Sequence, residues 1–220
     1  MTSTRRLSAI LGWLLVFLAL AALAPLPPVL DLDRAAALLL APLGRRWVWL
    51  QGVWIAGGVL LTGLAVAGLG LRRRPPWGLW AGFLAGSLVE VALKHLLVLP
   101  RPHPLPAPAP WPALIAATNL DAVTAAAWLH HWLPQAGPVR HLLAGSFPSG
   151  HLFRLSYVTG AAAGPRRRAL LWGVAATAAL AVTATGGHWI WDAAGGYALA
   201  RFCLSLAGQA SVSRKASAPR

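Results

Sequence analysis

The chain has 220 residues, of which 57% are hydrophobic and only 11% are charged, and its formal net charge is +14. Soluble domains contain about 25% charged residues, so this composition excludes an ordinary soluble protein and indicates a membrane protein. The basic residues stand in short clusters between apolar runs, which is typical of membrane anchors and argues against a nucleic-acid-binding surface. The single cysteine, Cys203, excludes a disulfide framework and a metal site built from several thiolates.

Apolar runs predict six transmembrane helices, because a helix needs about 20 apolar residues to cross a bilayer. The first run follows Arg5 and Arg6 as in a signal peptide, but it is long and has no convincing small-residue cleavage site, so we expect it to be retained. The sequence therefore predicts an all-α, polytopic membrane protein in which residues 1–220 form one domain, a six-transmembrane-helix bundle. The spans are expected at residues 7–26, 47–71, 77–99, 149–163, 169–185 and 189–206.

The distribution of basic residues predicts the orientation of these spans. The arginine and lysine clusters near both termini, at 72–74 and at 166–168 fall on one side, which the positive-inside rule makes cytoplasmic. We therefore expect a multi-pass protein of a bacterial-type cell (inner) membrane with both termini in the cytoplasm. Outside it, residues 31–46 are expected to form a short interfacial helix. Residues 102–147 form a long, proline-rich outer loop with a helical pattern at 119–133 that lies on the membrane or caps the site.

Lys94 and Arg101 are the first candidate site residues. Lys94 lies about two turns before the outer end of the third span, and the prolines on either side of Arg101 predict that the helix ends close to it. Charged residues inside spans favour a functional role, although a cation near a span end also snorkels toward the interface without one. Glu90 shares a helix face with Lys94, where it either holds Lys94 in place or only neutralises it.

The second candidate group is the run Pro148, Ser149, Gly150 and His151 at the start of the fourth span. Proline followed by serine before an apolar run predicts a helix start, with Ser149 as its N-cap. Helix N-termini bind phosphate through their N–H groups and dipole, and Gly150 lets an anion approach the backbone closely. In isolation, an ordinary helix cap with an interfacial histidine explains the same run.

His188 and Asp192 form the third group, four residues apart and expected on one helix face. A carboxylate that accepts from one imidazole nitrogen leaves the other nitrogen able to attack an electrophile. A local hydrogen bond is the common alternative, but an aspartate inside a span is costly and favours function. The predicted topology brings Lys94, Arg101, His151 and His188 to the same outer face, although nothing in the motif spacing requires this.

These three groups, in this order, resemble the type-2 phosphatidic acid phosphatase family, whose superfamily also contains the vanadium haloperoxidases. That family's pattern is Lys, six residues and Arg-Pro; then Pro-Ser-Gly-His; then Ser-Arg, five residues, His, three residues and Asp. The first element is complete from Lys94 to Pro102, and the second is complete at residues 148–151. The third matches at His188 and Asp192 only, because Ala181 and Val182 replace its Ser-Arg.

The resemblance implies a metal-independent and cofactor-free phosphatase. His188 would attack phosphorus to form a phosphohistidine, Asp192 would orient His188, and His151 would protonate the leaving oxygen and then activate water. The phosphoryl oxygens would be held by fixed cations and donors, which dominate such catalysis. These substrate-binding residues would be Lys94, Arg101, Ser149 and Gly150.

Val182 stands where the family pattern has a phosphate-binding arginine. Unless another cation takes the place of that arginine, the difference implies a loss of several kcal/mol of transition-state binding. Arg154, three residues after His151, is the candidate replacement, and the alternative is that it pairs elsewhere or lines a polar cavity.

The predicted function is hydrolysis of a lipid phosphate or diphosphate, with undecaprenyl diphosphate or phosphatidic acid as the substrate. The lipid bilayer is a further expected partner, and nucleic acid is not expected; the oligomeric state is left open. One alternative is a lipid phosphotransferase, in which His130, His131 or His141 of the outer loop serves an acceptor. The other is a non-catalytic phospholipid-binding or transport protein with a degenerate site. A haloperoxidase is disfavoured, because its vanadate site belongs to soluble proteins.

Overall fold

The structure is a computed structural model that describes residues 3–72, 77–97, 99–100, 102, 145–163 and 167–216. Within these residues all regular secondary structure is helical, which confirms the predicted all-α class. The elements are α1 (Ser3–Leu23), α2 (Pro27–Arg46), the 3-10 helix η1 (Val48–Gln51), α3 (Gly52–Ala56), α4 (Val59–Arg72), α5 (Trp77–Leu97), α8 (Gly150–Ala163), α9 (Arg168–Ala184) and α10 (Ile190–Ala216).

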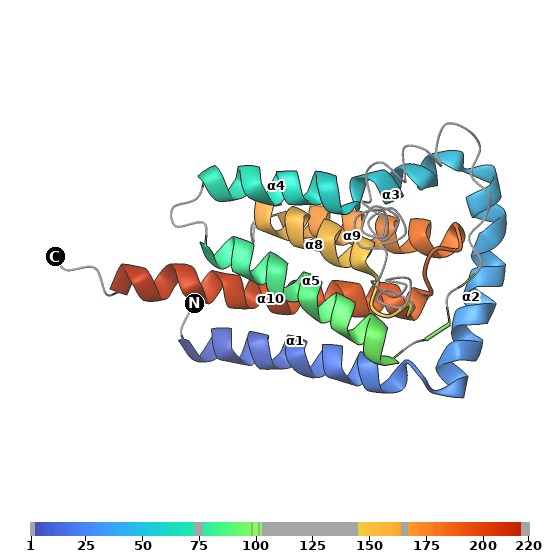
Figure 1. Ribbon diagram of the computed structural model, residues 1–220, viewed down its shortest axis with the longest axis horizontal. Coiled ribbons are helices and arrows are strands. Elements are labelled where there is room, and N and C mark those ends of the chain that lie inside the picture. Colours follow the sequence, from blue (N-terminus) through green and yellow to red (C-terminus); the bar gives the residue numbers. More distant parts are fainter. Residues whose placement is uncertain are drawn as a thin grey trace, which may run out of the picture.

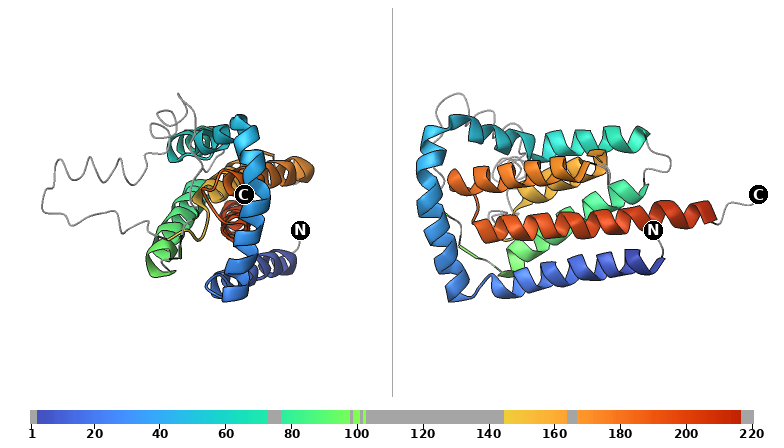
Figure 2. Two further views of the ribbon diagram at one scale, coloured as in Figure 1. Left: turned by 90° about the vertical axis from the view of Figure 1, so that its right-hand side faces the viewer. Right: turned by 180° about the vertical axis from the view of Figure 1, so that it is seen from behind.

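The long helices form a bundle around α10, which packs against α1, α5, α8 and α9 (Figure 1). The first turn of α1 and the last turn of α10 lie at one end of this bundle, and α2 crosses the opposite end (Figures 1 and 2). We call the end crossed by α2 the capped end. It contains the last turn of α5, the first turn of α8 and the first turn of α10, so it gathers segments that are far apart in the sequence.

A proline pair turns the chain from α1 across the capped end. Leu26 is extended, with φ −74° and ψ 136°, and Pro27 and Pro28 begin α2, which lies at 91° to α1. Proline fits the first turn of a helix but cannot continue the preceding one. The helix expected at 31–46 therefore begins earlier, at Pro27.

The second expected span, at 47–71, is not one continuous helix. The run is divided into η1, α3 and α4, and the break between α3 and α4 falls at Gly57 and Gly58. Gly57 N–H still donates to Val53 O at 2.8 Å, whereas the Gly58 carbonyl accepts from the Thr62 hydroxyl at 2.6 Å. Two adjacent glycines favour such a break, because glycine loses the most conformational freedom in a helix.

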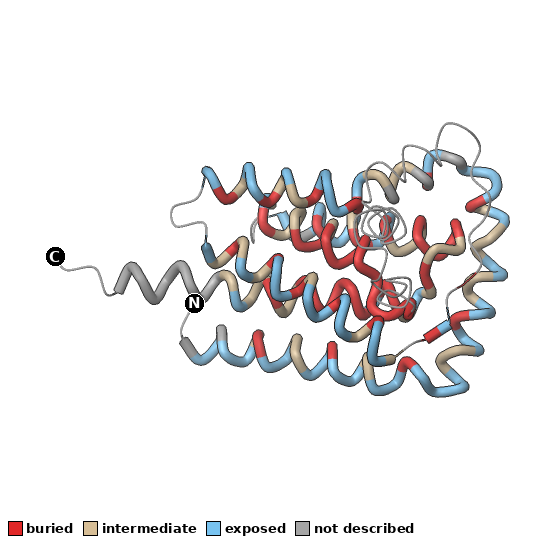
Figure 3. The backbone as a smooth tube through the Cα atoms, viewed as in Figure 1, coloured by how far each residue is buried: buried red, intermediate tan, exposed pale blue. Residues whose placement is uncertain are grey.

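Close packing of α8 on α10 fixes the start of α8. A methyl group at Gly196 of α10 would collide with the carbonyl oxygen of Ser149. Further along α8, Phe153 and Tyr157 are fully buried, and the Tyr157 hydroxyl donates to Leu79 O at 2.7 Å. Figure 3 shows that buried positions concentrate along α8, α10 and the segment that enters α8.

By length and composition, α5 qualifies as a membrane span, and the bent pair of α1 and α2 qualifies only if it is counted as one broken span. The apolar helices α4 and α9 are shorter. The six-span arrangement therefore stays a prediction. The expected helix at 119–133 and the candidates His130, His131 and His141 lie outside the described residues.

Candidate functional site

The candidate site lies at the capped end, where three chain segments meet. Lys94 is in the last turn of α5, Ser149 and Gly150 are at the start of α8, and His188 lies two residues before α10. The sequence-predicted residues that the structure describes are thus brought to one end of the bundle. Arg101 lies outside the described residues.

A short non-helical segment, residues 145–149, joins these elements. Gly145 N–H donates to Lys94 O at 3.1 Å, and Ser146 N–H donates to Leu99 O at 3.1 Å. At its other end, Ser149 N–H donates to Asp192 O at 2.9 Å. The peptide bond before Pro148 is cis. Because backbone bonds reach both α5 and α10, the segment fixes where α8 begins.

The first turn of α8 agrees with the predicted helix start. The helix begins at Gly150, and the Ser149 hydroxyl accepts from Leu152 N–H at 3.4 Å, a weak N-cap bond. His151 is buried, with 9% of its surface exposed. Its ring centroid lies 6.1 Å from that of His188, at an interplanar angle of 55°, so the two imidazoles are neighbours.

Asp192 joins several parts of the site. Its Oδ2 lies 3.4 Å from His188 Nδ1 and accepts from Trp189 N–H at 3.0 Å, and its Oδ1 accepts from the Ser146 hydroxyl at 3.3 Å. The bond to Trp189 N–H satisfies an amide that the helix itself leaves without a partner. Asp192 therefore both starts α10 and faces the imidazole.

His188 lies in the turn before α10, so the expectation that it shares a helix face with Asp192 is corrected. Gly186 adopts φ 72°, which only glycine accommodates easily. The Val182 carbonyl then accepts from Gly187 N–H at 2.9 Å and from His188 N–H at 3.1 Å. This turn places His188 beside Asp192 without a helical repeat.

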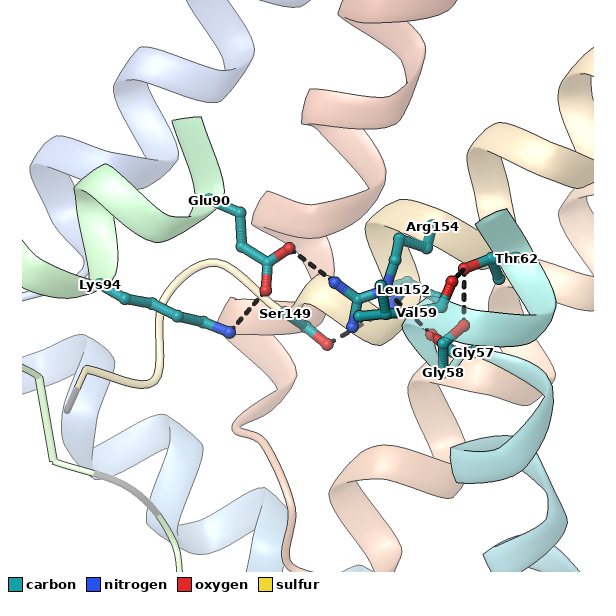
Figure 4. A network of polar contacts seen from close by, with 9 residues as sticks. All are labelled: Gly57, Gly58, Val59, Thr62, Glu90, Lys94, Ser149, Leu152 and Arg154. Atoms are coloured by element: carbon teal, nitrogen blue, oxygen red, sulfur yellow. Dashed lines mark hydrogen bonds and ion pairs between the residues drawn. The ribbon is translucent and has the colours of Figure 1, made fainter. Parts of the chain in front are cut away.

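Three buried charges form a cluster across α5 and α8 (Figure 4). Glu90 Oε1 lies 2.7 Å from Lys94 Nζ, and Glu90 Oε2 lies 2.9 Å from an Arg154 NH group. Arg154 Nε–H also donates to the buried carbonyl of Gly57 at 3.0 Å, at the break between α3 and α4. Each of the three charged side chains is less than a tenth exposed. With all three groups ionised, the cluster carries one net positive charge.

The Glu90 carboxylate lies against the first residue of α8. A methyl group at Gly150 would collide with both carboxylate oxygens. Glycine is thus required at this position for close approach of an anion, and the anion in this structure is the Glu90 side chain.

Val182 and Arg154 have different surroundings. The Val182 side chain is fully buried in an apolar cluster with Leu152, Ala178 and Ala193. Arg154 instead joins the cluster of Lys94 and Glu90. The structure thus places Arg154 of α8 in the same cluster as Lys94, whereas Val182 lies on α9.

The sequence reasoning missed Asp33 of α2. Its Oδ1 accepts from Trp191 N–H at 3.0 Å, so a residue of the crossing helix caps α10. Burial, together with the nearby charge of Asp192, raises the pKa of Asp33 from 3.8 to about 6. Nothing in the local sequence links Asp33 to a helix 158 residues later. The Gly57 carbonyl was also missed, although the Gly57-Gly58 pair is a recognisable break signal.

A cavity of about 330 Å³ lies between α2 and the turn that carries His188. Its walls are largely apolar and include Leu38, Ala184 and Trp189, with Arg34 as a cation. Trp189 Nε1–H donates to Pro100 O at 2.7 Å, which joins the end of α5 to the same turn.

Among the residues that the structure describes, no group of three His, Cys, Asp or Glu side chains is arranged to hold a metal ion. No protein-family model, curated protein or solved structure matches the chain.

Proposed function

We propose that the protein is an integral membrane enzyme that hydrolyses a lipid phosphate or diphosphate through a phosphohistidine intermediate. One observation carries the proposal: segments that are distant in the sequence bring two imidazoles, a carboxylate, two cations and a helix N-terminus to one end of the bundle. Phosphoryl transfer needs a nucleophile, a proton donor and fixed positive charge.

His188 is the nucleophile in this proposal. Asp192 Oδ2 lies 3.4 Å from Nδ1, so its charge favours the tautomer with the proton on that atom, and the lone pair of Nε2 then attacks phosphorus. The phosphorus–oxygen bond to the lipid then breaks, and the departing oxygen takes a proton from His151. Both histidines and Asp192 are nearly buried, which strengthens their electrostatic interactions.

His151 then acts as the base. It takes a proton from water, the water oxygen attacks phosphorus, and the phosphorus–nitrogen bond to His188 breaks. The products are inorganic phosphate and a restored, protonated His151. Lys94, Arg154 and the first turn of α8 stabilise the negative charge of the phosphoryl oxygens throughout.

Exposed apolar surface supports a bilayer location for the bundle. Large side chains on α5 stay largely exposed, including Leu84 at 61%, Leu88 at 71% and Leu96 at 73%. Apolar side chains exposed to this extent need to be shielded from water, and in this proposal the lipid of the bilayer shields them. In this proposal the six spans are α1, α4, α5, α8, α9 and α10, of which α4, α8 and α9 are the shortest. The remaining long helix, α2, lies along the membrane surface.

The substrate is a lipid phosphate such as phosphatidic acid, or a prenyl diphosphate such as undecaprenyl diphosphate. The positive-inside rule places the capped end outside the cytoplasm, since Arg72 and Arg168 lie at the other end of the bundle. The apolar cavity between α2 and the turn before α10, lined by Gly186 and Trp189, offers space for part of a lipid chain.

The test is phosphate release by the detergent-purified full-length protein, measured in the presence of EDTA with both lipids in parallel. We expect release from at least one lipid and none from His188→Ala. Folded wild-type protein that releases phosphate from neither lipid would refute hydrolysis of both. It would favour the phosphotransferase or the lipid-binding protein.

A further inference from the structure

The bridging carboxylate of Glu90 is not explained by the catalytic steps above. Its side chain is 5% exposed and contacts one cation on its own helix and one on α8. Two separate carboxylates would neutralise two separate cations, but here a single carboxylate is shared between Lys94 and Arg154. The cluster therefore keeps a net positive charge that a further anion can compensate.

The position of Glu90 is also the position that attracts an anion. Its oxygens lie against Gly150 at the N-terminus of α8, where the helix dipole and the first N–H groups favour negative charge. Lys94 and Arg154 approach the same carboxylate at 2.7 and 2.9 Å. Two cations and a helix N-terminus thus converge on this one side chain.

Counted over the contacts that the described residues make, both cations retain N–H donors for a second anion. A lysine ammonium has three N–H donors and a guanidinium has five, whereas Glu90 takes one donor from each and Gly57 takes one more from Arg154. A phosphoryl group bound at the remaining donors lies within a few ångströms of the Glu90 carboxylate. Like charges at that range repel strongly where water is excluded.

We propose that Glu90 is a resident counter-anion of the phosphoryl site, which positions Lys94 and Arg154 and limits how tightly the site holds inorganic phosphate. This inference rests on the proposed function and deepens it. Inorganic phosphate is the final product, so a weaker hold on it allows faster release. Glu90 acts through the two cations and is a positioning residue, with no direct part in bond breaking.

The test compares wild type with Glu90→Gln, which has nearly the same shape and lacks the charge. Binding of inorganic orthophosphate to the detergent-purified full-length protein is measured by calorimetry, and product inhibition is measured in parallel. Removing one like charge at this range corresponds to an affinity increase of about tenfold, with product inhibition strengthened by a similar factor. Asp31→Asn is the control for net charge, because Asp31 is exposed and pairs only with Arg34 among the described residues.

Suppose that wild type binds orthophosphate and that folded Glu90→Gln binds it equally or more weakly. This result would refute the role of Glu90 but not the anion site. Absence of orthophosphate binding by both proteins would refute the anion site itself and this inference with it. If Glu90→Gln does not fold, wild type still provides a test by infrared difference spectroscopy. Orthophosphate should then shift a carboxylate band that Glu90→Asp alters, and an unchanged band would overturn the proposal.

Discussion

Asp192 Oδ2 lies 3.4 Å from His188 Nδ1 and also accepts from Trp189 N–H at 3.0 Å, so one carboxylate starts α10 and faces the proposed nucleophile. The two contacts have separate consequences. The first places a negative charge beside Nδ1 of the imidazole, and the second holds the backbone at the start of the helix.

Asp192→Asn should separate these consequences, because the amide oxygen still accepts from Trp189 N–H but carries no charge. We expect kcat for phosphate release to fall roughly 100-fold or more, with little change in helical content. Steady-state kinetics and circular dichroism measure the two effects. Ser146→Ala is the matched control: it removes one long hydrogen bond from a neutral donor and leaves the Asp192 charge in place, so its effect should be roughly fivefold. Equal losses in both variants would contradict an electrostatic role for Asp192.

His151→Ala should slow hydrolysis of the phosphohistidine more than it slows phosphorylation of His188. The variant lacks the base that activates water, so a labelled lipid phosphate should leave label on His188. Acid-labile, base-stable label on the protein is the measurement, and His188→Ala should carry none. Full turnover by His151→Ala at the wild-type rate would remove His151 from the mechanism.

Arg154→Met should weaken inhibition by orthovanadate, which mimics the phosphoryl group. The substitution keeps much of the side-chain volume but removes one of the two cations that contact Glu90. We expect an inhibition constant at least about tenfold higher than that of wild type. Arg72→Met, at the opposite end of the bundle, controls for the loss of one positive charge. If both variants respond equally to vanadate, Arg154 does not belong to the anion site.

Val182→Arg should destabilise the protein and should not restore a phosphate-binding arginine. The side chain at this position is enclosed by Leu152 and small apolar residues, so a guanidinium would be overpacked and without a carboxylate. The expected cost is about 3 kcal/mol of unfolding free energy. Thermal unfolding of Val182→Arg beside Val182→Ile measures it. Higher phosphatase activity in folded Val182→Arg would show that the missing arginine is a real deficiency of the site.

Asp33 should make stability depend on pH between about 4 and 6. The pKa of Asp33 is raised to about 6 by burial, so the folded chain binds this proton more tightly than the unfolded chain does. The resulting stabilisation is fully present below pH 4 and is lost as the pH rises through 6, by about 3 kcal/mol at most. Asp33→Asn keeps an oxygen that can accept from Trp191 N–H, so it should raise stability at pH 7.5 and remove this pH dependence. Thermal unfolding from pH 4 to pH 7.5 provides the measurement, and an identical pH profile in wild type and variant would contradict the prediction.

Much of the helical layout follows from local sequence, because apolar runs and proline or glycine boundaries act over a few residues. The starts of α5, α8 and α9 fall within one residue of their predicted positions. The prediction of one continuous helix at 47–71 was wrong in the middle of that run. The length and hydropathy of the run outweighed the local signal of the Gly57-Gly58 pair. The ion pair of Glu90 with Lys94 was predictable from helical spacing, since residues four apart share a face.

The sequence by itself determined the residue types at the site, since its three motifs contain the histidines, the carboxylate, the serine and Lys94. Only the tertiary structure decided which of them act together. It joined Arg154 to Glu90, supplied the Gly57 carbonyl from a broken helix and brought Asp33 to cap α10. These contacts join residues 64, 97 and 158 positions apart. The propensity of a short segment contains no information about contacts over such separations. These contacts arise when packed helices bring distant polar groups together and exclude water around them.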